Sequence, residues 1–353
     1  MIASKKQLSL RNSTILTYLN EQKDALFFDI ETTGLFWKNS HLYLIGVVYF
    51  EDGQWILEQW FLDRPTEEAL LLQEFAAVCK GKKRMIHYNG NGFDIPYLQH
   101  KYNFYQIDNP MGQLDSLDLY RIAKPFQELF GLTSVKQKNV ERFLILNRTD
   151  TYSGGELIQV YSEYLGTRDD NLLSTLLLHN LEDVQGLIDL LPIIGYERAC
   201  KGSFSVSSAD FIGYTLTLQL QLKQPVPRPV QASCPYYDLH LSDDTGKLQI
   251  YGRGGSMKHF FQDYKDYYYL PLEDQAIHKS VGAYVDSAHR KKAKASNCYQ
   301  KSEGTFLPQL NERFKPDFYE EYKSKPAYFS YKDEFLQDMQ NLHTYACDFL
   351  SDI

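Results

Sequence analysis

Two acidic residues lie one position apart at the end of an apolar run, and this feature constrains the chain most. The run Ala25–Phe28 leads directly into Asp29, Ile30 and Glu31. Side chains alternate between the faces of a strand, so Asp29 and Glu31 share one face while Ile30 points into the core. Two such carboxylates repel each other and are costly to desolvate unless a divalent cation lies between them. All-oxygen ligation favours Mg²⁺ or Mn²⁺.

An isolated pair of this kind also occurs as a turn acid beside a surface acid, so its meaning depends on further acids that reach the same place. The segment Asn89–Pro96 follows a second apolar, strand-like run, and its glycines and asparagines suit a sharp turn from strand to helix. Asp94 then lies in the first turn of that helix. In a later apolar-periodic segment, His179 and Asp183 are four residues apart and share one helix face. Acids in three separated segments therefore favour one shared metal site.

These three segments together resemble the DEDD-type (DnaQ-like) 3′–5′ exonuclease superfamily, whose members have a ribonuclease H-like fold. Its three motifs match Asp29 with Glu31, then Asp94, and then Asp183. Within the superfamily the chain is most similar to the YprB-like branch of predicted bacterial exonucleases. The further matches to that branch are Val140-Glu141, Arg148-Thr149-Asp150, Gly155-Glu156, Tyr161–Leu165 and His179-Asn180. The resemblance spans about the first 200 residues, and three motifs in the right order are far more specific than any one of them.

The resemblance implies a metal-dependent 3′–5′ exonuclease that hydrolyses phosphodiester bonds at the end of single-stranded DNA or RNA by a two-metal-ion mechanism. The residues that it implies as ligands of two Mg²⁺ or Mn²⁺ ions, and as catalytic, are Asp29, Glu31, Asp94 and Asp183, with Asp29 bridging both ions. The residues that we expect to support the terminal nucleotide are Thr32, Gly34, Leu35, Asn89 and Phe93.

The chain departs from the superfamily pattern at His179. Most members carry either a tyrosine four residues before the last acid or a histidine five residues before it. Here a histidine stands at the tyrosine spacing. Its residue type suits a general base near neutral pH, so we interpret His179 as the catalytic base. The alternative is that His179 positions its neighbours without taking a proton.

Two other functions are compatible with the same fold. One is a catalytically inactive nucleic-acid-binding or scaffold protein, which typically lacks one or more of the acids. The other is a nuclease that cuts internal bonds or hydrolyses short oligonucleotides. All four acids are present in this chain, which favours an enzyme over the inactive binder.

The composition is that of a globular protein, with 43% hydrophobic and 23% charged residues. No apolar run reaches the roughly 18 residues of a membrane helix, and the first residues lack a signal-peptide pattern. The five cysteines show no C-x-x-C spacing and support neither a disulfide framework nor a zinc site. We therefore expect a cytoplasmic protein without membrane association. The net charge of −8 argues against tight duplex binding but allows a short single-stranded end to be held at the metals.

The order of patterns predicts an α/β chain in three parts. Residues 1–23 are expected to form an N-terminal arm or polar helix, 24–200 a ribonuclease H-like domain with a mixed sheet flanked by helices, and 201–353 a β-rich α+β domain. The expected elements include strands at Ala25–Ile30, His41–Phe50, Gln54–Leu62, Met85–Tyr88 and Thr215–Leu222, and helices at Thr66–Cys79, Ile95–Tyr105, Glu273–Val285 and Tyr331–Leu350. Asp115 and Asp118 are explained more simply as a helix cap and a first-turn acid than as further ligands.

Overall fold

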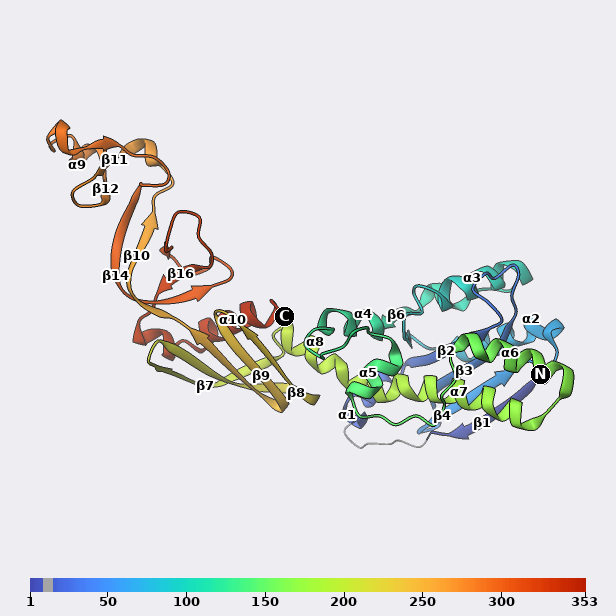
Figure 1. Ribbon diagram of the computed structural model, residues 1–353. Coiled ribbons are helices and arrows are strands. Elements are labelled where there is room, and N and C mark those ends of the chain that lie inside the picture. Colours follow the sequence, from blue (N-terminus) through green and yellow to red (C-terminus); the bar gives the residue numbers. More distant parts are fainter. Residues whose placement is uncertain (9–14) are drawn as a thin grey trace. The chain divides into compact units, whose positions relative to one another are not determined.

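A mixed sheet forms the centre of the first of two units into which the chain divides, Met1–Ile194 and Gly195–Ile353 (Figure 1). The computed structural model describes residues 1–8 and 15–353. Among the described residues, the strand order is β1-β4-β3-β2-β5-β6. The strands are β1 (Ile2–Gln7), β2 (Ala25–Thr32), β3 (Leu42–Glu51), β4 (Gln54–Phe61), β5 (Arg84–His87) and β6 (Asp115–Asp118). The first four pair antiparallel, whereas β2, β5 and β6 run parallel, which confirms the expected mixed sheet.

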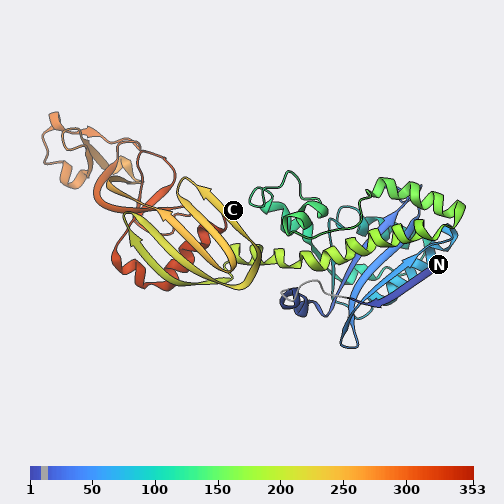
Figure 2. The same cartoon turned by 60° about the horizontal axis from the view of Figure 1, so that its bottom comes forward.

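The alternation of side chains along β2 decides which helix covers which face of the sheet. Phe28 packs against Phe75 of α2 (Glu68–Cys79), with ring centroids 5.3 Å apart. Asp29 points to the opposite face, which is covered by α7 (Asp170–Leu190), the long helix that runs along the sheet in Figures 1 and 2. The strand therefore presents apolar side chains to one helical layer and its acids to the other.

Close packing of α7 on the sheet depends on Gly46 in β3. Gly46 pairs with Asp29 of β2 and with Gln59 of β4, so these residues form one row across the sheet. Asn180 of α7 lies over this row, where it donates to Oδ2 of Asp29 (3.1 Å) and accepts from Nε2 of Gln59 (2.9 Å). A Cβ atom at position 46 would lie 2.1 Å from Oδ1 of Asn180 and 2.8 Å from Cγ2 of Val184. Only glycine allows the helix to come this close.

Local capping fixes where the helices of the first unit begin. The remaining helices there are α1 (Ile15–Leu19), α3 (Asp94–Tyr105), α4 (Leu119–Ala123), α5 (Gln137–Phe143) and α6 (Gly154–Thr167), and α8 (Ile194–Cys200) begins at the boundary. Ser153 and Glu156 form a capping box at the start of α6, and Asp169 caps α7. Asp118 accepts from the backbone N–H of Tyr120 and thus caps α4, whereas Asp115, for which the cap was predicted, is the first residue of β6. Among the described residues, no helix combines the length and apolar character needed to cross a membrane.

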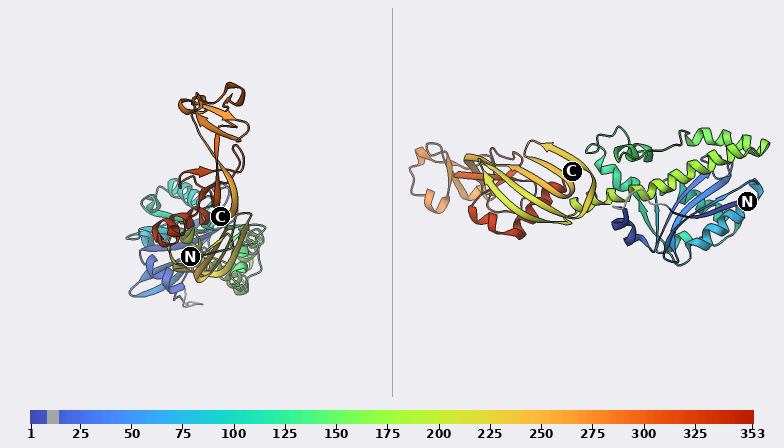
Figure 3. Two further views of the ribbon diagram at one scale, coloured as in Figure 1. Left: turned by 90° about the vertical axis from the view of Figure 1, so that its left-hand side faces the viewer. Right: turned by 90° about the horizontal axis from the view of Figure 1, so that it is seen from below.

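Three antiparallel sheets make up most of the described second unit, as Figures 2 and 3 show. Their orders are β7-β8-β9, β10-β14-β16-β15 and β12-β11-β13. The strands are β7 (Phe204–Ile212), β8 (Thr215–Cys234), β9 (Tyr237–Tyr251), β10 (Arg253–Phe260), β11 (Tyr267–Leu270), β12 (Gln275–His278), β13 (Lys291–Lys292), β14 (Tyr299–Gln309), β15 (Asp317–Phe318) and β16 (Ala327–Ser330). Helix α10 (Met339–Leu350) packs against the first of these sheets. The β-rich α+β character expected for this part is confirmed.

Two segments differ from the sequence-based prediction. In the N-terminal arm, Ile2–Gln7 is an edge strand paired with β4, while residues 9–14 lie outside the described residues. The helix expected over Glu273–Val285 is instead strand β12 followed by α9 (Lys279–Gly282), a single helical turn. In both places, hydrogen bonding to a neighbouring strand outweighs local helix propensity. Ile2–Gln7 pairs with β4, and β12 pairs with the tyrosine-rich strand β11.

The substitution Gly46→Ala is expected to lower the free energy of unfolding by on the order of 1–3 kcal/mol, because Asn180 and Val184 must move to admit the methyl group. Urea denaturation measures the effect. Gly166→Ala is the matched control, since Gly166 lies in α6 with nothing within 4 Å of the added Cβ. That control should be neutral or stabilising by about 0.5–1 kcal/mol. Equal stability of the two variants would contradict the close approach of α7.

Candidate active site

Strand β2 brings Asp29 and Glu31 to the face of the sheet that α7 covers. Asp29 is half-buried and Glu31 buried. The side-chain amide of Asn180 donates to Oδ2 of Asp29, and Gln59 in turn holds the amide oxygen of Asn180. The orientation of the Asp29 carboxylate is thus set by two buried neutral side chains, which leave its negative charge uncompensated.

Asp94 reaches the same region from the start of α3. The turn that leads to it contains Asn89 with φ of 59° and Gly90, whose missing Cβ leaves room for Nδ1 of His87. Asn89 suits this left-handed conformation because its short polar side chain tolerates it. Asp94 itself is buried, and the backbone of Ile30 in β2 hydrogen-bonds its carboxyl group. The sequence predicted this strand-to-helix turn, and the structure confirms it.

One face of α7 supplies the third segment. Nε2 of His179 lies 3.1 Å from Oδ2 of Asp183, one helical turn later, and 3.5 Å from Oε1 of Glu31. Ligand atoms of these three residues all lie within 4.8 Å of one another. A strand and a helix that are far apart in the sequence therefore present two carboxylates and an imidazole to one small volume.

A carboxylate that the sequence analysis assigned no role holds the other nitrogen of His179. Nδ1 of His179 lies 2.7 Å from Oδ2 of Asp150, and Nζ of Lys138 lies 2.9 Å from the same oxygen. An ionised carboxylate only accepts hydrogen bonds, so Nδ1 carries the proton. Glu182 holds the loop of Asp150 on α7 by accepting the backbone N–H groups of Thr149 and Asp150, both at 2.9 Å. This pairing fixes the ring orientation and directs Nε2 toward the acids.

Arg148 compensates part of the negative charge on the helix side. Its side chain is only 9% exposed, and one terminal nitrogen lies 2.6 Å from Oδ1 of Asp183 and 3.2 Å from both carboxylate oxygens of Glu141. Burial opposes ionisation of Asp183, but the hydrogen bond and charge of His179 and the guanidinium of Arg148 outweigh it and lower the pKa of Asp183. Asp183 is therefore the acid of the group that stays ionised most readily.

For Asp29, Glu31 and Asp94, the favourable contacts do not outweigh burial. Burial raises the pKa of Asp29 well above its ordinary value, and the charges of Asp183, Glu31 and Asp94 raise it further. Burial also raises the pKa of Glu31 to about 8, even though the charge of His179 opposes this shift. For Asp94, burial is again the largest cause and the pKa rises to about 7. The acids from all three segments thus repel one another. A divalent cation fits this oxygen-rich set of donors, because it would relieve the repulsion.

The residues expected to support a nucleotide occupy two loops beside these acids. Thr32 closes its own turn by donating from Oγ1 to the carbonyl of Gly34 (2.9 Å), while Leu35 is 81% exposed. The backbone N–H of Asn89 donates to Asp118, and Phe93 packs on Tyr97 with ring centroids 5.5 Å apart. Of these five residues, Leu35 offers the largest exposed apolar surface.

The sequence analysis gave no role to Asp150, Arg148, Asn180 or Gly46. The first three lie in segments that match the YprB-like branch, so the signal was present, but the pattern did not show which group each side chain contacts. Gly46 carried no signal, because a glycine inside a strand is equally compatible with a bulge.

Comparison with known proteins supports the fold of the first unit. Residues 26–194, just under half of the chain, match a family model described as the RNase_H superfamily. This match confirms the ribonuclease H-like fold expected from the three motifs, while the YprB-like branch stays a prediction. No curated protein matches the sequence at a significant level.

The solved structures that this chain matches include three of exonuclease I. The ExoI/SSB-Ct complex has 11% identity and a TM-score of 0.30 over 62% of this chain and 55% of that chain. A structure of exonuclease I interpreted in terms of processivity has 12% identity and a TM-score of 0.32, and the match covers 62% of this chain and 55% of that chain. A product-bound structure has 10% identity and a TM-score of 0.30, and the match covers 79% of this chain and 64% of that chain. The chain thus spans 55% to 64% of the length of these exonuclease I chains.

The metal-free protein is expected to lose stability as the pH rises from about 4 to about 8. The folded-state pKa values of Glu31, about 8, and Asp94, about 7, lie above the unfolded values of roughly 4. Below this window both states are protonated. Within it the unfolded chain releases its protons first, so rising pH favours unfolding. Thermal midpoints measured against pH in EDTA test the slope, and added Mg²⁺ should restore the midpoint at pH 8.

Asp94→Asn isolates the contribution of one acid to this effect. At pH 8 without metal, the variant is expected to be more stable than the unsubstituted protein by up to about 4 kcal/mol, because the pKa of Asp94 lies about three units above its unfolded value and one unit corresponds to about 1.4 kcal/mol. Asp52→Asn is the control, since Asp52 is exposed in a turn with φ of 48° that asparagine also adopts. A pH-independent midpoint together with an unchanged Asp94→Asn midpoint would contradict the mutual repulsion.

Arg148→Ala is expected to cost about 3–5 kcal/mol, because it leaves buried carboxylates without their cation. Arg148→Lys keeps the charge but loses the planar fork, so its loss should be intermediate. Arg142→Ala serves as the control, since Arg142 is exposed and donates to Asn139 at the surface. Denaturant unfolding measures all three variants, and equal losses at positions 142 and 148 would contradict the assigned role.

Proposed function

We propose that this chain, whose residues 26–194 match the RNase H superfamily and share its fold, is a metal-dependent nuclease that removes nucleotides from the 3′ end of single-stranded DNA or RNA. The observation that carries the proposal is the convergence of acids from three separated segments: ligand atoms of Glu31 and Asp183 lie within 4.8 Å of each other, and the charge of Asp94 acts on Asp29 and Glu31. Structural needs do not account for this convergence, because burial and mutual repulsion raise the pKa values of three of these acids. Such an arrangement is typical of sites that bind cations for catalysis.

The proposed ligands of the divalent ions are Asp29, Glu31, Asp94 and Asp183. Two Mg²⁺ or Mn²⁺ ions bound there would lower the pKa of the attacking water and offset the charge that develops on the phosphate during hydrolysis. The protein contributes the orientation of these carboxylates. Asn180 fixes Asp29, and Arg148 fixes Asp183, so both side chains are held before a substrate arrives.

His179 is the proposed general base. Its Nε2 faces Glu31 and Asp183, so a water molecule placed among these groups is within reach of that nitrogen. Its Nδ1–H donates to Asp150, which fixes the ring and stabilises the imidazolium after proton transfer. Other enzymes use the same type of pair, in which a buried carboxylate orients a catalytic histidine. Without metal, burial opposes protonation of His179, but Nε2 also faces the ionised Asp183, which raises the pKa of His179. A cation bound to Asp183 would weaken this contact.

The loop after β2 is the proposed contact for the terminal nucleotide. Leu35 is 81% exposed and Phe36 is 76% exposed, which is unusual for adjacent large apolar residues. The loop begins directly after Thr32, the last residue of β2. A base that packs on Leu35 and Phe36 would therefore lie close to the acids of that strand. A terminal base packed there would place its phosphodiester near His179 and Asp183.

End-labelled strands test the proposed reaction. With Mg²⁺, a 3′-labelled strand should release a labelled mononucleotide at once, whereas a 5′-labelled strand should shorten progressively. Matched DNA and RNA strands identify the preferred sugar. EDTA should abolish hydrolysis, and Asp29→Asn and Asp183→Asn should lower the rate by at least about 10²-fold. Internal cleavage products, or undiminished activity of either variant, would overturn the assignment.

Substitution of His179 separates proton transfer from metal binding. His179→Asn is expected to lower kcat by about 10²- to 10⁴-fold, as is typical for loss of a general base. Asp150→Asn should lower kcat less, because the ring remains but its orientation is no longer fixed by a charged partner. Both variants should keep the affinity for Mg²⁺ within a few-fold, as measured by calorimetry. An unchanged kcat in His179→Asn would exclude the histidine as the base.

A further inference from the structure

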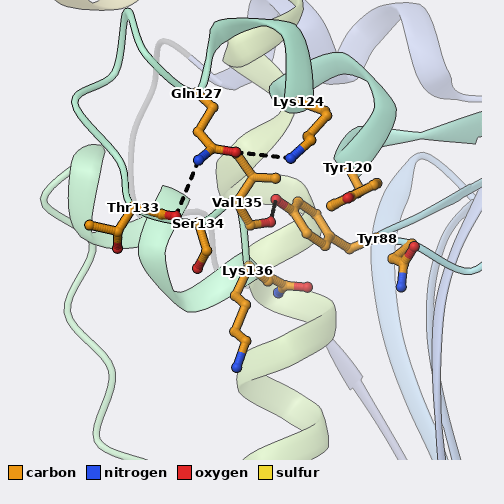
Figure 4. Close-up of a pocket in the computed structure, with 10 residues that line it drawn as sticks. Tyr88, Tyr120, Lys124, Gln127, Thr133, Ser134, Val135 and Lys136 are labelled. Carbon is orange, nitrogen blue, oxygen red and sulfur yellow. Dashed lines mark hydrogen bonds between the residues drawn. The ribbon is translucent and has the colours of Figure 1, made fainter.

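A pocket with a volume of about 450 Å³ lies next to the carboxylate site and is not part of it. Figure 4 shows the ten residues that line it, which come from the turn after β5, from α4 and the short 3-10 helix after it, and from the loop that leads into the first residue of α5. Two of these residues are lysines, Lys124 and Lys136, and none of the described lining residues carries a carboxylate. In a chain with a net charge of −8, a cavity of this size with positive and neutral walls favours an anionic ligand.

The two lysines are exposed and can reach a ligand phosphate. Lys124 donates from Nζ to Oε1 of Gln127 (3.0 Å), and Gln127 is itself held by the carbonyl of Thr133 (3.1 Å). An ammonium group has three N–H donors, so Lys124 can bind a phosphate oxygen without losing this contact. In Figure 4, Lys136 extends away from the other labelled side chains and thus lies at the edge of the pocket.

Two tyrosines form an aromatic wall of the pocket. The rings of Tyr88 and Tyr120 meet edge to face with centroids 6.0 Å apart, and both residues are half-buried. The hydroxyl of Tyr88 donates to the carbonyl of Val135 (2.6 Å), which fixes the ring (Figure 4). A fixed aromatic side chain beside a lysine is the combination that single-stranded nucleic acid requires, because bases stack on rings and phosphates pair with ammonium groups.

Two lining residues connect the pocket to the carboxylate site. Gln137 donates from Nε2 to the backbone carbonyl of Asp183 and to Oε1 of Glu141, both at 2.9 Å. Asn89, which also lines the pocket, begins the turn that ends at Asp94. A single-stranded nucleic acid whose 3′ end lies among the acids would therefore reach the pocket with the nucleotides that precede this end.

We infer that this pocket holds nucleotides of the single strand a few positions before its 3′ end, with one phosphate beside Lys124, a second phosphate beside Lys136, and a base or sugar against Tyr120. The inference rests on the proposed function and adds to it the place where the body of the strand is bound. Because an aromatic ring and two ammonium groups make the proposed contacts, and they recognise any base and any phosphate, the contact is independent of sequence.

Salt dependence of binding tests the inference in the full chain. The Asp29→Asn background prevents hydrolysis, and the probes are fluorescein-labelled oligothymidylate and oligouridylate of about 12 nucleotides, within the usual site size for single strands. Each phosphate contact contributes about 0.7 to the slope of log K against log salt. Lys124→Ala with Lys136→Ala should therefore reduce the slope by about 1.4 and weaken binding. Tyr120→Leu should weaken binding about 5- to 100-fold at an unchanged slope.

The control pair is Lys6→Ala with Lys80→Ala, two exposed lysines of the same unit that do not line this pocket. It removes the same net charge and should leave the slope unchanged. Equal slopes for the two pairs would overturn the inference. A second result would also overturn it. If the variant Lys124→Ala with Lys136→Ala is inhibited less by a free mononucleotide but binds the longer probes as before, the pocket is a product site.

Hydrolysis assays separate this inference from the proposed function. In the otherwise unsubstituted protein, the pocket lysine pair should raise KM for the longer strands with little change in kcat, and should leave hydrolysis of a dinucleotide unchanged because a dinucleotide does not reach the pocket. An unsubstituted protein that hydrolyses no strand refutes the proposed function, while the binding slopes still test the pocket. Normal hydrolysis with an unchanged KM in the variant refutes the pocket alone.

Discussion

The concentration of negative charge between β2 and α7 is the constraint on which the first unit depends. Asp29 and Glu31 point toward the helix, and the helix returns Asp183 toward the strand, so burial and repulsion act on the same few side chains. The fold keeps these groups together through neutral hydrogen bonds to Asn180 and through one buried cation, Arg148. Both are directional contacts, and neither cancels the full charge. The remaining deficit is what suits the site to a divalent ion.

The acids and His179 depend on two kinds of structural support. The backbone provides position: Gly46 lets the helix come close, and the turn at Asn89 starts α3 where its first acid faces the sheet. Side chains outside the motifs provide orientation, as when Asp150 fixes the ring of His179. Loss of the first kind displaces whole elements, whereas loss of the second changes the angle of one group. Stability and catalysis are therefore expected to respond to different substitutions in this protein.

Much of the fold followed from sequence patterns because the patterns were local. The apolar run before Asp29 and the glycine-rich turn before Asp94 define their elements by themselves, and the family match confirms the ribonuclease H-like core. The assignment of the acids as ligands stays a prediction. Contacts such as Arg148 with Asp183 depend on how a loop packs against a helix, and no spacing encodes that. The prediction of a helix over Glu273–Val285 was wrong for the same reason, since pairing of β12 with β11 decided the conformation of this segment.

Residues with three different tasks stand within a single turn and a half of α7. His179 faces the carboxylates, Asn180 holds a strand residue, and Glu182 retains the loop that carries Asp150. Each step along a helix rotates the side chain by about 100°. Insertion or deletion of one residue before position 179 would therefore remove imidazole, amide and loop anchor from their partners simultaneously. Evolution can vary these side chains one at a time, but it cannot change the register of this helix without losing all of their contacts together.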